Sequence, residues 1–188
     1  MFERFTRPAR AAVVLAQEEA RELRTREMAP QHLLLGVLQA ADNDLSGVLS
    51  GYGLTADVVR TRLIEACPTT DDSFDEDVEA LRAIGIDLRA VRDSVARTFG
   101  ADVLDSALAR SGRRRRRRGH IPFTRAAKKC VELAVREALA HKDNEIACTH
   151  LLLGIMRSDD KAAVGLITEH VYTAQLRASI LTLLDKAA

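Results

Sequence analysis

Apolar residues recur at helical spacing early in the chain, with polar residues between them. The apolar side chains fall three or four positions apart and predict one buried face of a helix, at Ala9, Ala12, Val13, Ala16, Ala20 and Leu23. Thr6 precedes this stretch as an expected N-cap, because its hydroxyl can accept from a free backbone N–H. Pro8 falls in the first turn, where a missing amide donor costs little. The pattern therefore predicts a helix from Thr6 to about Leu23.

Three shorter apolar segments follow, and each has a signal for its start or its end. Pro30 begins a second predicted helix, in which Gly36 allows a neighbouring backbone to approach closely. A third covers residues 45–49 and ends near two glycines, and a fourth begins after Thr55 and reaches Ile64. The second half of the chain shows the same order, with helices expected over 124–141, from His150, over 162–170 and over 173–184. We expect four helices in each half.

The two halves are related by an internal repeat. Residues 5–36 return without a gap at residues 123–154, with half of the positions identical. Such density at a fixed spacing indicates a duplicated unit. The predicted fold is all-α, with two four-helix repeats packed around a pseudo-twofold axis as one domain. We place repeat 1 at 1–67, an insertion at 68–118 and repeat 2 at 119–188, and expect a ligand site near the axis or once in each repeat.

The insertion has two parts. Residues 76–109 carry an apolar series and resemble the last two helices of a repeat, so they are interpreted as a partial third copy or, alternatively, as an unrelated helical hairpin. Six arginines, Arg113–Arg118, close the insertion. Their mutual repulsion favours an exposed tether. The alternative is nucleic-acid binding through phosphate neutralisation.

Composition narrows the class of protein. The chain is 47% hydrophobic but only 4% aromatic, which favours a helical core of Ala, Leu and Val. Lys plus Arg (28) nearly equals Asp plus Glu (27), so net charge indicates neither a nucleic-acid nor a membrane partner. No apolar run approaches the roughly 20 residues of a membrane span, and we expect a cytoplasmic protein.

The sequence offers little reactive chemistry. Cys67, Cys130 and Cys148 are odd in number and lack Cys-x-x-Cys spacing, so we expect reduced thiols, two in the core and Cys67 at a helix end. His32 and His150 begin the second helix of each repeat without a second ligand at metal spacing. They are interpreted as structural residues or, alternatively, as ligand contacts. Single Asp, Glu and Ser residues are assigned to polar helix faces, and we expect no enzyme, cofactor or metal.

Several motifs resemble one known family. They are Met1-Phe2-Glu3-Arg4-Phe5-Thr6, the run at residues 14–20, His-Leu-Leu-Leu-Gly at 32–36, and Gly-His-Ile-Pro-Phe-Thr at 119–124. Together they closely resemble the double Clp repeat, the N-terminal domain of ClpC-type AAA+ unfoldases, over about residues 1–66 and 119–184. The resemblance implies a non-catalytic domain that captures substrates and adaptors for an ATPase ring, which feeds a ClpP-type protease. The sequence contains no Gly-x-x-x-x-Gly-Lys-Ser/Thr phosphate loop, so we expect a free-standing binding domain.

The resemblance also implies candidate ligand residues. Some ClpC N-domains bind phosphorylated arginine through an acid placed just before each repeat's histidine, and here those positions hold Gln31 and Thr149. A neutral contact contributes about 0.5–1.5 kcal/mol against roughly 1.5–3 for a charge-assisted one, so phosphoarginine binding by that mode is not expected. Basic groups near the helix starts can still attract an anion, at Arg7, Arg10, Arg125 and Lys128.

Phenylalanines near the repeat junctions complete the predicted site. Phe5 and Phe123 are equivalent by duplication, and both are interpreted as core residues that fix helix starts. Phe2 has no counterpart, and with Phe123 it is expected to form an apolar platform for a peptide or a hydrophobic ligand.

The leading hypothesis is a regulator of Clp-dependent proteolysis that binds protein clients or adaptors, in connection with a ClpC/ClpP system, as adaptor, competitor or sequestering decoy. One alternative is a nucleic-acid-associated protein that binds through Arg113–Arg118. Another is self-regulation, in which the insertion occupies the binding groove.

Overall fold

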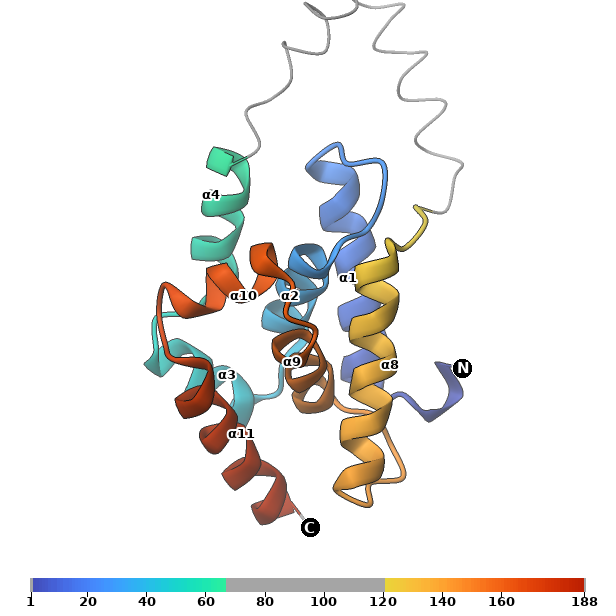
Figure 1. Ribbon diagram of the computed structural model, residues 1–188, viewed down its shortest axis with the longest axis vertical. Helices are drawn as coiled ribbons and strands as arrows, with labels where there is room; N and C mark the ends of the chain where they lie inside the picture. Colours follow the sequence, from blue (N-terminus) through green and yellow to red (C-terminus); the bar gives the residue numbers. More distant parts are fainter. Residues whose placement is uncertain (1, 67–120, 188) are drawn as a thin grey trace, which may run out of the picture. The chain divides into compact units, whose positions relative to one another are not determined.

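A computed structural model describes residues 2–66 and 121–187. These residues form eight α-helices and one short 3-10 helix, with two isolated bridges and no strand among them. The prediction of an all-α fold with four helices per repeat is confirmed (Figure 1). The first repeat contains η1 (Phe2–Arg4), α1 (Arg7–Glu22), α2 (Pro30–Ala40), α3 (Asn43–Gly51) and α4 (Ala56–Ala66), and the second contains α8 (Arg125–Ala140), α9 (Cys148–Arg157), α10 (Lys161–Thr168) and α11 (Thr173–Ala187).

The predicted insertion, its arginine run and Cys67 lie outside the described residues, so the boundaries at 67 and 119 stay predictions. Residues 1–63 and 121–188 form one compact unit. Of the other unit, residues 64–120, the structure describes only the end of α4. None of the helices in the described part is long and apolar enough to cross a membrane.

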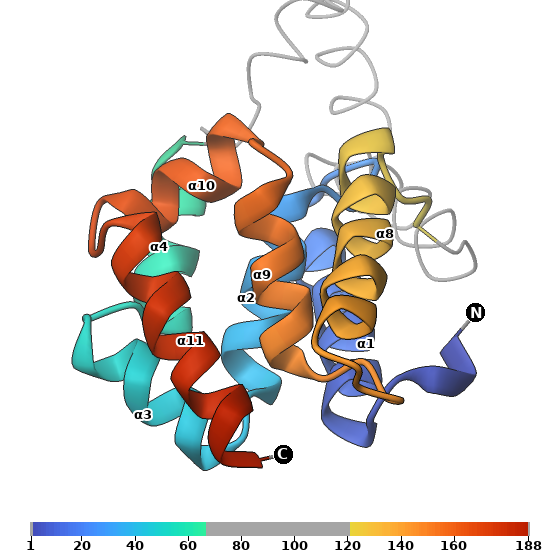
Figure 2. The same cartoon turned by 60° about the horizontal axis from the view of Figure 1, so that its bottom comes forward.

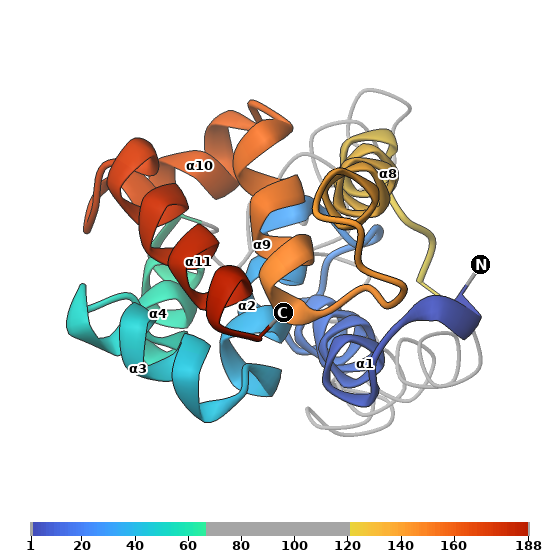
Figure 3. The same cartoon turned by 90° about the horizontal axis from the view of Figure 1, so that it is seen from below.

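Within the first unit, α2 and α9 lie at the centre. They are flanked on one side by α1 and α8 and on the other by the two pairs α3, α4 and α10, α11 (Figures 2 and 3). Buried leucines of α2 and α9 supply much of the core, at Leu33, Leu34, Leu35, Leu151, Leu152 and Leu153. The repeated His-Leu-Leu-Leu-Gly motif is therefore the central packing element of both repeats.

Side-chain caps fix the helix starts, and they occur at equivalent positions in both repeats. Thr6 accepts from the Ala9 amide at 3.3 Å, and its equivalent Thr124 accepts from Ala127 at 3.0 Å. The predicted Thr6 cap is confirmed. Asp42 at α3 and Asp160 at α10 act in the same way, accepting from amides 2.9 and 3.0 Å away. Each cap satisfies an amide that has no partner inside the helix.

The two repeats are joined by reciprocal backbone hydrogen bonds. The Ile146 amide donates to the Arg4 carbonyl at 2.7 Å, and the Thr6 amide donates to the Ile146 carbonyl at 3.0 Å. The same pair is made by Met28, which donates to Pro122 at 2.8 Å and accepts from Thr124 at 3.0 Å. Each repeat thus attaches the start of its first helix to the loop between the first two helices of the other.

The phenylalanines beside these bonds are not equivalent in burial. Phe5 is 1% exposed and belongs to the core, as predicted. Phe123 packs against the core but stays partly exposed, so the prediction that both are core residues is wrong for Phe123. The side chain of Phe2 lies outside the described residues, and the Phe2–Phe123 platform stays a prediction.

Close packing of the first two helices depends on a glycine in each repeat. A Cβ placed on Gly36 would lie 2.0 Å from the Ala12 carbonyl oxygen, and one on Gly154 would lie 2.4 Å from that of Cys130. Only a residue without a side chain fits there, which confirms the prediction for Gly36. Cys130 and Cys148 are buried free thiols, as predicted.

A buried carboxylate joins helices in each repeat, contrary to the assignment of acids to polar faces. Glu19 is 4% exposed and accepts from Gln39 at 2.6 Å and from Arg60 Nε at 3.2 Å. Its equivalent Glu137 is 2% exposed and accepts from Arg157 at 2.9 Å and Arg177 at 3.0 Å. The partners come from the second and fourth helices, so one carboxylate holds three helices together.

The environment of these carboxylates favours the charged form. Burial alone raises the pKa of Glu137, but hydrogen bonds and charge from Arg157 and Arg177 outweigh burial and lower it below its ordinary value of 4.5. The same balance, with hydrogen bonds from Arg60 and Gln39 and the charge of Arg60, lowers the pKa of Glu19. A lowered folded-state pKa contributes stability that is present above pH 4.5 and is lost as pH falls through the folded-state value.

Substituting Gly36→Ala or Gly154→Ala should lower the free energy of unfolding by about 1–3 kcal/mol, because the added methyl group collides with backbone that cannot give way. Urea unfolding at neutral pH measures it. Gly165→Ala in α10 is the matched control, since nothing lies within 4 Å of its Cβ, and it should stabilise by about 0.5–1 kcal/mol. Equal effects at positions 154 and 165 would contradict the packing argument.

Substituting Glu137→Gln should lower the free energy of unfolding at pH 7 by about 1–3 kcal/mol, because two guanidinium groups lose an ionic partner. The difference from the unsubstituted chain should shrink as pH falls below 4.5, since the native carboxylate then also becomes neutral. Urea unfolding at pH 7 and at about pH 3 measures both values. A difference that is constant with pH would show that ionisation of Glu137 contributes nothing.

Candidate functional site

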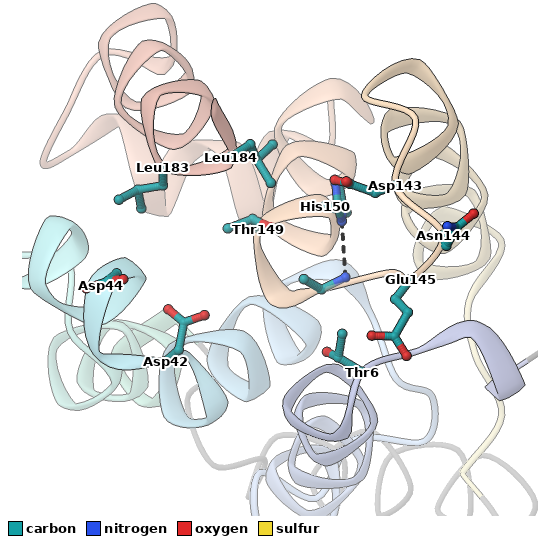
Figure 4. A pocket seen from close by; sticks show the side chains of 11 residues that line it. Thr6, Asp42, Asp44, Asp143, Asn144, Glu145, Thr149, His150, Leu183 and Leu184 are labelled. Atoms are coloured by element: carbon teal, nitrogen blue, oxygen red, sulfur yellow. Dashed lines mark hydrogen bonds and ion pairs between the residues drawn. The ribbon is translucent and has the colours of Figure 1, made fainter. Parts of the chain in front are cut away.

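A pocket of about 380 Å³ lies where the two repeats meet. Repeat 1 contributes the N-cap of α1 and the start of α3, and repeat 2 contributes the loop before α9, the first turn of α9 and the end of α11 (Figure 4). The reciprocal backbone bonds of Ile146 hold that loop against the start of α1. The lining residues are Thr6, Asp42, Asp44, Asp143, Asn144, Glu145, Ala147, Thr149, His150, Leu183 and Leu184.

His150 forms the base of this region and fixes the start of α9. It is 1% exposed, and its Nδ1 accepts from the Ala147 amide at 3.1 Å. Because Nδ1 is an acceptor, the neutral ring carries its proton on Nε2, which lies 3.0 Å from Asp143 Oδ2. Burial lowers the pKa of His150, and the charge of Asp143 acts in the opposite direction. The ring is thus held neutral by burial and oriented by two contacts.

His32 has the same role in repeat 1. Its Nδ1 accepts from the Ala29 amide at 3.0 Å, and burial lowers its pKa to about 4 despite the charge of Glu19. The structural interpretation of both histidines is confirmed by these helix-start bonds. Residue 25, the counterpart of Asp143, is a threonine, so only repeat 2 pairs its histidine with an acid at this position.

Thr149 brings a buried polar atom without a hydrogen-bond partner to the pocket. It is 7% exposed, and its Oγ1 has no hydrogen-bond partner in the described part of the chain. Its side chain projects from α9 into the space between Asp42 and Leu184 (Figure 4). A buried hydroxyl without a partner costs free energy unless another group satisfies it.

The lining of the pocket combines negative charge with apolar side chains. The pocket is lined by four carboxylates, those of Asp42, Asp44, Asp143 and Glu145. None of its lining residues is Lys or Arg. Asp42 also caps α3. Leu183 and Leu184 of α11 form an apolar wall (Figure 4). Among the described residues, no three His, Cys, Asp or Glu side chains are arranged to hold a metal ion.

Of the residues predicted to form the site, Thr149 is the one that lines this pocket. Gln31, at the equivalent position in repeat 1, is half-buried and lies outside it. Phe123 packs against the core and does not line it either. Four basic residues are exposed in the first helical turns and are not part of the lining, namely Arg7, Arg10, Arg125 and Lys128. The structure therefore does not gather the predicted residues into one site.

Sequence reasoning missed the acids and leucines of the pocket. Asp42 had a signal, because an aspartate three residues before Leu45 is a helix-cap pattern. Asp143 and Glu145 looked like ordinary loop residues. Leu183 and Leu184 looked like part of an apolar helix face, and only the packing of α11 next to α3 brings them to the acids.

Comparison with known proteins identifies the family. The family model described as the Clp repeat (R) N-terminal domain matches residues 4–77 and 74–170. The chain belongs to this Clp repeat family. The second match begins before the predicted repeat 2 and includes most of the predicted insertion.

Curated relatives are much longer proteins. The chain is 29% identical over 189 residues to an ATP-dependent Clp protease ATP-binding subunit ClpA homolog of Cyanidium caldarium, a match that covers 100% of this chain and 17% of that protein. It is 29% identical over 167 residues to the chloroplastic chaperone protein ClpC1 of Arabidopsis thaliana, covering 89% of this chain and 13% of the relative. The Clp repeat chain thus spans less than a fifth of the length of these relatives.

Solved structures support the same fold. The N-terminal domain of the caseinolytic protease associated chaperone ClpD from Arabidopsis thaliana superposes with a TM-score of 0.63 at 24% identity, covering 98% of this chain and 99% of that chain. The Hsp104 N-terminal domain from Candida albicans gives a TM-score of 0.60 at 14% identity, covering 96% and 91%. At these identities the likeness is one of fold.

Substituting Asp143→Asn should lower the pKa of His150 further, because it removes the charge that opposes burial. An NMR pH titration of the His150 ring measures the midpoint in both proteins. His32, which has no acid at the position equivalent to Asp143, is the internal control and should not change. An unchanged His150 midpoint would show that the 3.0 Å approach of Asp143 carries no electrostatic coupling.

Proposed function

We propose that this Clp repeat chain is a non-catalytic binding module that captures protein clients or adaptors and regulates Clp-dependent proteolysis. The observation that carries the proposal is a pocket built from both repeats, whose lining combines four carboxylates with two leucines. A site with charged and apolar walls suits a protein side chain with its neighbouring backbone. The regulatory role can be that of an adaptor, a competitor or a sequestering decoy.

The relatives support a connection with the Clp protease. They include proteins named as ATP-binding subunits of the ATP-dependent Clp protease, and the solved neighbours are N-terminal domains of chaperones. We propose that this chain acts in the compartment that holds such a protease, which is the cytoplasm or, as for the chloroplastic relatives, the plastid.

The state of the thiols and imidazoles supports a binding role. Burial raises the pKa of Cys148 to about 12, and its Sγ donates to the Ala40 carbonyl at 3.8 Å. Burial also raises the pKa of Cys130. A protonated, buried thiol is a poor nucleophile. The imidazoles of His32 and His150 are both committed to helix starts.

The purified chain should change the rate at which a ClpC-type unfoldase and a ClpP-type protease from its own organism degrade a labelled protein substrate. An adaptor raises the rate for its client, whereas a competitor or decoy lowers it. Asp44→Arg should reduce the effect at least fivefold, because its larger side chain and reversed charge change the surface that a client in the pocket contacts.

The matched control is Glu132→Arg, which makes the same change of charge on an exposed position of α8 outside the pocket. This control should leave the effect on degradation unchanged. If the chain alters degradation of no substrate at saturating concentration, the regulatory proposal is wrong. If both arginine variants act alike, client capture does not use the pocket.

A further inference from the structure

We propose that the pocket selects an unphosphorylated basic side chain, arginine or lysine, of a bound protein and excludes an anionic one. This rests on the proposed function and adds the chemical class of the group recognised. The occupant is an organic monocation with an aliphatic stem, attracted by the four carboxylates of the lining and placed with its stem along Leu183 and Leu184.

The first support is unneutralised negative charge. Asp42, Asp44 and Glu145 form no ion pair with the described residues, and Asp143 is paired only with a histidine whose pKa is lowered by burial. Arg4 is bonded to the same loop, but through the Asn144 carbonyl, which accepts from its Nε at 3.3 Å. A cation entering the pocket therefore meets carboxylates without a competing guanidinium.

The second support is the unsatisfied hydroxyl of Thr149. Its Oγ1 is buried without a partner at the pocket, between a carboxylate and a leucine (Figure 4). A hydroxyl oxygen has two lone pairs and can accept from a guanidinium or an ammonium group. A donor from the ligand would satisfy the buried hydroxyl of Thr149; the other buried lining atom without a hydrogen bond, His150 Nε2, lies 3.0 Å from Asp143.

The third support is the difference between the two repeats. The positions in repeat 1 that correspond to Asp143, Asn144 and Thr149 hold Thr25, Arg26 and Gln31. In α10, Ala162 occupies the position of Asp44. The pseudo-equivalent location, built from the loop before α2 and the start of α10, therefore has two acids fewer and one base more, so the cation site exists once in spite of the duplication.

The lining of the pocket favours an amphipathic cation over a metal ion. The described carboxylates are not arranged to converge on one ion. Arginine and lysine carry their charge at the end of an apolar stem, which can lie on the leucines while the charged end stays near water and the acids. A phosphate on the arginine would bring negative charge into a site that already holds four carboxylates.

The test is an amide NMR titration of the full chain with five-residue acetylated and amidated peptides, Gly-Ala-X-Ala-Gly, in which X is arginine, lysine, phosphoarginine or glutamine. The arginine and lysine peptides should bind saturably, with shifts at Glu145, Thr149 and Leu184. Glutamine and phosphoarginine should bind at least tenfold more weakly. Equal binding of arginine and glutamine, tighter binding of phosphoarginine, or no binding by either basic peptide would overturn the proposal.

Two sets of substitutions show whether the pocket residues bind the basic side chain or only support the fold. Asp44→Asn with Glu145→Gln should weaken the arginine peptide about tenfold or more, whereas the matched pair Glu27→Gln with Glu132→Gln should not. Thr149→Val keeps the side-chain shape and should weaken binding while leaving stability unchanged or higher, because it removes an unsatisfied hydroxyl. Unchanged peptide affinity in both pocket variants would refute the site.

The degradation assay separates the two proposals. If the chain regulates degradation but the basic peptides do not bind, the side-chain selectivity is wrong and the proposed function stands. If the peptides bind as expected but degradation is unaffected, the pocket is a cation site and the proposed regulatory function is wrong.

Discussion

The arrangement of the site depends on the reciprocal backbone bonds between the repeats. Ile146 exchanges two hydrogen bonds with Arg4 and Thr6, at 2.7 and 3.0 Å, and Met28 makes the same pair with Pro122 and Thr124. Every residue except proline supplies the same backbone donor and acceptor, so this connection tolerates most sequence changes at the residues that make it. Because residue 146 lies between Glu145 and the start of α9, the bonds also place the acidic loop beside Thr6. The pocket is a consequence of how the repeats are joined.

Buried carboxylates attach the fourth helix of each repeat to the rest of the fold. Glu137 accepts from Arg177 on α11, and the orientation of α11 decides where Leu183 and Leu184 lie. Glu19 makes the equivalent bond with Arg60 on α4, but its other partner is the neutral Gln39 where repeat 2 has Arg157. Neutralising Glu137 therefore removes the ionic partner of two partly exposed cations, whereas neutralising Glu19 affects only Arg60, which also pairs with Asp57 at 3.5 Å. Repeat 2, which contributes most of the pocket, is thus the repeat whose buried carboxylate pairs with two arginines.

Sequence reasoning succeeded where the physical cause is local. The Thr6 cap, the tight approach at Gly36 and the repeated helix order follow from neighbours within a few residues or from the duplication itself. It failed for Glu19 and Glu137, because a carboxylate on a helix is ordinarily solvated, and the arginines that bury it come from a helix 40 residues later. The acids of the pocket were missed for the same reason, since only tertiary packing brings Asp44 and Glu145 to one pocket. Their equivalence to Ala162 and Glu27 gave no hint of a shared site.

Duplication separates positions that hold the fold from positions free to specialise. The caps, the close glycines, the helix-start histidines and the buried glutamates are the same residue in both repeats, and each is engaged in packing or bonding. Asp143, Thr149 and Asp44 differ from their counterparts Thr25, Gln31 and Ala162, and all three line the pocket. Changes there leave the joining bonds and the buried carboxylates untouched. A difference in charge between the two pseudo-equivalent locations could therefore arise at little cost in stability, which is the condition for one repeat to acquire a binding preference that the other lacks.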